Sequence, residues 1–81
     1  MNFLSEIAKR ADASPKVIEK IKEANTARHV SEIIQENSIE GFFELICSET
    51  HRHMKKHSER NVSIEVILFD FDGKILARKS E

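Results

Sequence analysis

Apolar residues recur at helical spacing over most of the chain. In residues 3–11 they fall at every third or fourth position, which places them on one face of a short helix. Ser14 and Pro15 then favour the start of a second helix, because Ser is a good N-cap and Pro fits the first helical turn. This second segment extends to about residue 36. Asn25 and Thr26 are weak helix formers, and they leave open whether it is one helix or two.

A further amphipathic helix is predicted from residue 39 to about residue 59. Ser38 is a suitable N-cap for it. The apolar positions form one broad stripe on a helical wheel, and they are Ile39, Phe42, Phe43, Ile46 and Met54.

After this helix the period of the pattern changes from 3.6 to two. Residues 62–69 and 75–78 are rich in β-branched and aromatic residues, and Asp72-Gly73 between them is a strong hairpin signal. We therefore expect an α+β fold in which three or four N-terminal helices are followed by a C-terminal antiparallel β-hairpin. Residues 1–36 are helical, 38–60 form the amphipathic helix and 62–79 form the hairpin, all within a single domain.

The two faces of the predicted hairpin differ in composition. A loop of two residues and a loop of four assign the same residues to each face. The face expected to pack on the helices carries Ile64, Val66, Leu68, Ile75 and Ala77. The other face is mixed, but Ile67, Phe69 and Leu76 make an apolar patch on it. We expect this patch at an interface, in a homodimer or with a larger protein partner, unless a helix already covers it.

Composition narrows the class of protein. The chain has 81 residues, of which 40% are hydrophobic and 33% charged, with two Gly and one Pro, as expected for one small globular domain. A net charge of −1 gives no overall attraction to nucleic acid or to anionic membranes. The single cysteine, Cys47, excludes an intrachain disulfide and suits a reducing compartment. No apolar run approaches the roughly 20 residues of a membrane helix, so we expect a cytoplasmic protein without a membrane partner.

The string that most resembles a catalytic motif is Asp70-Phe71-Asp72-Gly73. After an apolar strand it resembles the first motif of haloacid-dehalogenase-type phosphatases, in which the two Asp residues act with Mg²⁺. Only eight residues follow Gly73, and Lys74 stands where that family has Thr. A hairpin turn explains every residue of the string, and we therefore predict no enzyme active site here.

Cys47, His51, His53 and His57 have the chemistry of zinc ligands. On a helix, however, Cys47 and His51 lie roughly 120° around the axis from His53 and His57, so one helix cannot direct all four at one metal ion. We expect no metal and no cofactor, with His53 and His57 as weak candidates. A basic patch of Arg52, Lys55, Lys56 and Arg60 is suited to contact phosphates, although such runs are usually solvated helix faces.

Residues 4–21 resemble the helix-turn-helix of lactose-repressor-type regulators. Ala8 falls where the two helices touch, Ser14-Pro15 falls at the start of the recognition helix, and Asp12 replaces the turn glycine. Ile7, Ile18 and Ile21 fall on core positions. The resemblance implies that the DNA contacts are made by Ser14, Lys16, Val17 and Lys20.

Two functions follow from these patterns, and neither is enzymatic. The first is a small DNA-binding transcriptional regulator that binds duplex DNA as a homodimer. The alternative is a protein–protein interaction module, a small regulatory or adaptor factor that docks through its hairpin edge or through the patch of Ile67, Phe69 and Leu76.

Overall fold

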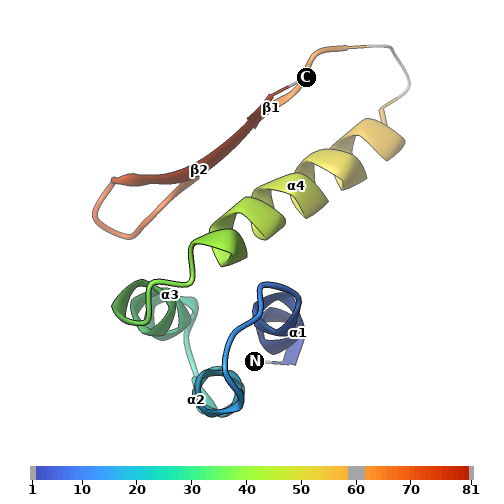
Figure 1. Cartoon of the computed structure of the whole chain (residues 1–81). Coiled ribbons are helices and arrows are strands. Elements are labelled where there is room, and N and C mark those ends of the chain that lie inside the picture. The colour runs from blue at the N-terminus through green and yellow to red at the C-terminus, as the bar shows by residue number, and fades with distance from the viewer. Residues whose placement is uncertain (1, 59–61, 81) are drawn as a thin grey trace. The chain divides into compact units, whose positions relative to one another are not determined.

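The computed structural model describes residues 2–58 and 62–80. Over these residues, four helices precede a two-stranded antiparallel sheet, which confirms the predicted α+β class (Figure 1). The chain divides into two compact units, the first reaching to Phe42 and the second starting at Phe43. The elements are α1 (Asn2–Arg10), α2 (Pro15–Glu23), α3 (Ala27–Glu36), α4 (Glu40–Lys56), β1 (Glu65–Phe69) and β2 (Ile75–Ser80).

The segment that the sequence left as one helix or two forms two helices, α2 and α3. Ala24 leaves helical geometry with φ −67° and ψ 141°. Thr26 then caps α3, because its hydroxyl accepts a hydrogen bond from the backbone N–H of His29 at 3.1 Å. Ser14 caps α2 in the same way, and its hydroxyl accepts from the backbone N–H of Val17 at 3.3 Å.

The core of the first unit forms where α2 contacts both α1 and α3. Ile21 and Ile34 have no exposed surface there. Burial of each such side chain contributes about 1.5–3 kcal/mol to stability, which offsets the entropy lost in ordering short helices. The buried apolar residues of this unit are Ile7, Ala8, Val17, Ile21, Ala24, Val30, Ile33, Ile34 and Phe42.

Helix α1 ends in a Schellman motif at Asp12. Asp12 has a left-handed backbone, with φ 62°. Its N–H donates to the carbonyl of Lys9 at 3.1 Å, and the N–H of Ala13 donates to the carbonyl of Ala8 at 3.0 Å. Asp tolerates this region better than most residues, so it can stand where a glycine is usual.

Helix α3 ends in the same motif at Ser38. The N–H of Ser38 donates to the carbonyl of Gln35, and the N–H of Ile39 donates to the carbonyl of Ile34, each at 3.2 Å. Ser38 has φ 54°, so its backbone closes α3. We predicted that Ser38 would cap the following helix, but its left-handed backbone differs from the extended geometry of an N-cap.

The hairpin turn is fixed by Asp70. Its backbone N–H donates to the carbonyl of Lys74 at 2.8 Å, and its carbonyl accepts from the N–H of Gly73 at 3.2 Å. Its carboxylate accepts from the backbone N–H groups of Lys74 at 2.9 Å and Asp72 at 2.8 Å. These bonds, with the one from Lys74 first, lower the pKa of Asp70 below its ordinary value of 3.8.

The loop between the strands contains three residues, 71–73, where two or four were expected. Gly73 takes φ 89°, which suits a left-handed position after a tight turn. A loop with an odd number of residues places the first residue of β2 on the opposite face of the sheet from that expected. Ile75 therefore pairs with Phe69. The expectation that Ile75 shares a face with Leu68 was therefore wrong. A bulge then restores the expected alternation, since Leu68 pairs with Ala77 and leaves Leu76 as the extra residue.

In the second unit, three side chains of α4 that lie four residues apart contact the chain in or just before β1, which lies beside the helix (Figure 1). The ring of His51 lies with Nε2 3.2 Å from the carbonyl oxygen of Ile64. Lys55 Nζ donates to the carbonyl of Val62 at 2.7 Å. The buried thiol of Cys47 completes this series. These contacts hold the chain in and just before β1 against the helix.

Replacement of Ser38 by Gly is expected to raise the free energy of unfolding by about 1 kcal/mol, because an L-residue is strained in the left-handed region and Gly is not. Gly73→Ala, at a similar backbone angle, is expected to lower it by about 1 kcal/mol. Urea denaturation measures both changes. A Ser38→Gly variant no more stable than the parent would contradict this account of the turn.

Asp70→Asn is expected to lower stability at neutral pH by weakening the turn. Because the folded pKa lies below 3.8, the unfolded chain binds the proton more tightly, so the stabilising effect is present above 3.8 and is lost as pH falls through the folded value. Thermal unfolding should therefore show the two proteins converging in acid. Asp72→Asn is the matched control, since only the backbone of Asp72 bonds to Asp70. An Asp70→Asn deficit that persists unchanged in acid would argue against a role for the charge.

Candidate functional site

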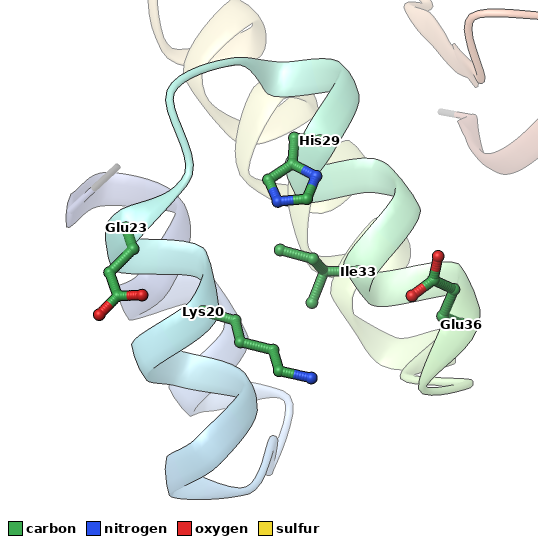
Figure 2. Close-up of a pocket in the computed structure, with 5 residues that line it drawn as sticks. All are labelled: Lys20, Glu23, His29, Ile33 and Glu36. Carbon is green, nitrogen blue, oxygen red and sulfur yellow. The ribbon is translucent and has the colours of Figure 1, made fainter.

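A groove with a volume of about 420 Å³ opens between α2 and α3. Figure 2 shows Lys20 extending from α2 toward α3, while His29 and Ile33 face α2 from the neighbouring helix. Glu23 and Glu36 complete the lining. These residues lie at helical spacings of three, four and three along their own helices, so each helix presents one face to the groove.

The groove is suited to bind a polar group. Its lining offers the ammonium of Lys20 and the carboxylates of Glu23 and Glu36, with Ile33 at its apolar base. His29 Nδ1 lies 3.8 Å from a carboxylate oxygen of Glu32, and both side chains are more than half exposed, so this pair contributes little to stability. None of the five lining residues is a serine, threonine or cysteine, so the lining itself offers no hydroxyl or thiol nucleophile.

The four predicted DNA-contacting residues do not form one exposed surface. Val17 is only 6% exposed and belongs to the core, so it cannot reach a base. The hydroxyl of Ser14 is engaged in capping α2. Lys16 is exposed, and Lys20 lines the groove toward α3.

The predicted basic patch is largely engaged in local contacts. Arg52 Nη2 donates to a carboxylate oxygen of Glu49 at 2.7 Å, and Lys55 is bonded to the backbone before β1. Lys56 is exposed. Arg60 lies outside the described residues.

The four candidate metal ligands separate as the helical wheel predicts. Cys47 and His51 are buried, with 1% and 7% of their surface exposed. Burial raises the pKa of the Cys47 thiol, and a hydrogen bond from the backbone of Leu68 partly offsets this. The rings of His53 and His57 lie side by side on the exposed side, with centroids 4.4 Å apart. Within residues 2–58 and 62–80, no three His, Cys, Asp or Glu side chains are grouped to hold a metal ion.

The proposed interface residues of the hairpin differ in exposure. Phe69 is 52% exposed, whereas Ile67 and Leu76 are half-buried. Ile75, which the sequence placed on the covered face, is 49% exposed and pairs with Phe69.

Comparison with known proteins identifies the family. Residues 1–80 match the family described as CbiD, C-terminal domain. The chain belongs to this family. No solved structure matches it.

The relatives of this CbiD domain are much longer proteins that carry an enzyme name. The chain is 34% identical over 77 residues to the cobalt-precorrin-5B C(1)-methyltransferase of a Geobacillus strain, a match that covers 95% of this chain and 21% of the relative. It is 39% identical over 76 residues to the protein of the same name from Leptospira borgpetersenii, covering 94% of this chain and 21% of the relative. The CbiD domain thus spans about a fifth of the length of these relatives.

The family overturns the functional expectations drawn from the sequence. The chain is not a lactose-repressor-type regulator, because the CbiD match extends over residues 1–80, whereas the helix-turn-helix resemblance covered only residues 4–21. The expectation of a non-enzymatic regulator or adaptor was also wrong, since the relatives are named as methyltransferases. No helix in the described part of the CbiD domain is long and apolar enough to cross a membrane.

Of the groove residues, the sequence analysis named only Lys20, as a DNA contact. Ile33 is 4% exposed and also belongs to the core. Glu23, His29 and Glu36 carried no recognisable signal. They are ordinary polar residues of two separate helices, and only the packing of α2 beside α3 brings them to one groove.

Proposed function

We propose that the chain acts as the C-terminal domain of a cobalt-precorrin-5B C(1)-methyltransferase. The observation that carries this proposal is the family match over residues 1–80, supported by relatives that are 34% and 39% identical along more than nine-tenths of the chain. The lone, buried Cys47 suits a reducing cytoplasm, which is where we place the protein.

The domain supplies part of the enzyme's binding surface. Methyl transfer requires a donor and an acceptor held together in a reactive geometry. A groove of about 420 Å³ lies in the lower part of the range of roughly 300–1,000 Å³ that is usual for a single ligand. The groove is therefore too small to enclose both reactants, and we assign the rest of the active site to the part of the enzyme outside this domain, which is about four-fifths of the relatives' length.

In this domain, we assign the contact with the ligand to the α2–α3 groove. Lys20, Glu23 and Glu36 bring three charges to a concave surface. Charged side chains of this kind fix the orientation of a polar group on a ligand, which raises the fraction of encounters that lead to reaction.

A chimera tests the proposal. The 77 matched residues of the Geobacillus relative are replaced by the corresponding residues of this chain, and conversion of cobalt-precorrin-5B to its C1-methylated product is followed by mass spectrometry. The chimera is expected to methylate the substrate, whereas the relative lacking those residues is expected to be inactive. A folded, soluble chimera that fails to methylate, or a truncated relative that is fully active, contradicts the proposed function.

The assignment of the groove is tested in the same chimera by Lys20→Met. This change removes the ammonium and keeps most of the side-chain volume, and we expect kcat/KM to fall by about tenfold or more, as for loss of a charged hydrogen bond. Lys16→Met is the control, because Lys16 is an exposed lysine on the same helix outside the groove lining. Equal activity of the two variants would show that Lys20 makes no contact with either reactant.

A further inference from the structure

One face of the hairpin carries large apolar side chains that are exposed. Register places Glu65 opposite Ser80, Ile67 opposite Arg78 and Phe69 opposite Ile75, so these side chains share a face. Side-chain contacts agree with this, since a carboxylate oxygen of Glu65 accepts from the hydroxyl of Ser80 at 3.0 Å and lies 3.8 Å from Arg78 Nε. We call these six residues the open face.

The open face is apolar near the turn and charged at its far end. Phe69 and Ile75 are each about half exposed, at 52% and 49%, and Ile67 is half-buried beside them. Phe71 in the turn is 53% exposed. An aromatic and aliphatic centre with a polar rim has the composition of a protein interface, in which a few large apolar side chains supply most of the binding energy.

The opposite face of the sheet carries Val66, Leu68 and Ala77. Leu68, on that face, is half-buried, and its backbone bonds to the thiol of Cys47 from α4. A two-stranded sheet is at best marginally stable in water when nothing covers it. The hairpin therefore gains stability from a second layer on the open face.

The size of the open face favours an occupant in the same polypeptide. A stable dimer usually buries about 800 Å² on each partner, more than three apolar side chains on two short strands expose. A segment attached to the domain needs far less area, because the linkage gives it an effective concentration of about millimolar. In the relatives, about four-fifths of the chain is attached in this way.

We propose that the open face, centred on Phe69 and Ile75, is the surface on which the remainder of a CbiD-type methyltransferase packs. This inference rests on the proposed function, since it takes the rest of the enzyme as the partner. The partner surface is an apolar pocket or strand that receives Phe69, bordered by polar groups that meet Glu65 and Arg78.

Hydrogen exchange of the hairpin amides tests this docking. The isolated chain is compared with the Geobacillus chimera described above, and the amides of β1 and β2 are expected to exchange at least about tenfold more slowly in the chimera. Phe69→Glu and Ile75→Glu in the chimera should remove most of this protection. Phe3→Glu is the control, because Phe3 is 70% exposed on α1 in the first unit and should leave the protection unchanged. Circular dichroism of each variant of the isolated chain checks that the domain still folds.

The outcomes separate the two proposals. Equal exchange in the chimera and in the isolated chain overturns the docking surface, and methylation by that chimera still supports the proposed function. Protection that appears in the isolated chain and grows with its concentration shows that a second copy occupies the face, which also overturns the inference. A chimera whose hairpin is protected through Phe69, but which methylates nothing, supports the docking surface and contradicts the proposed function.

Discussion

The second unit depends on the series of contacts from Cys47, His51 and Lys55 to the chain in and before β1. These three residues are four positions apart, which is slightly more than one helical turn, so their side chains leave the same side of α4. Each hydrogen bond of this kind contributes only about 1 kcal/mol, but together with the buried thiol they fix the helix against β1, in a sheet that is too small to stand alone. These contacts leave Phe69 and Ile75, which pair on the open face, each about half exposed.

The elements of this fold were largely predictable because local chemistry determines them. Ser14-Pro15 is a local signal for the start of a helix, and Asp72-Gly73 favours a turn between two apolar strands. Two predictions were wrong. The face on which Ile75 lies depends on whether the loop has an odd or an even number of residues, and the role of Ser38 depends on its backbone angle. Nothing in a period-two pattern reveals the three-residue loop that turns Ile75 to the open face. A serine such as Ser38 reads as an N-cap, although here its left-handed backbone ends the preceding helix.

The functional expectations failed for a different reason. The residues that resembled a DNA-binding motif, such as Ala8, Ser14 and Ile21, perform packing and capping, which any two short helices joined by a tight turn require. Val17 shows the difference, because a base-reading residue must be exposed and this one is core. The sequence showed no sign of the enzyme name that the relatives carry, because a domain that spans a fifth of their length need not contain a catalytic constellation of its own. Groove residues brought together from α2 and α3 leave no linear motif in the sequence.

The two Schellman motifs also constrain how the length of this domain can vary. At Asp12 and at Ser38, consecutive backbone N–H groups donate back to the last turn of the helix, and the next helix begins soon afterwards, at Pro15 and at Glu40. An insertion or deletion at either turn would break the bonds and rotate the following helix about its axis, which would withdraw its apolar face from the core. Insertions and deletions among members of the family should therefore avoid both turns, and a designed fusion or affinity tag is better placed elsewhere in the chain.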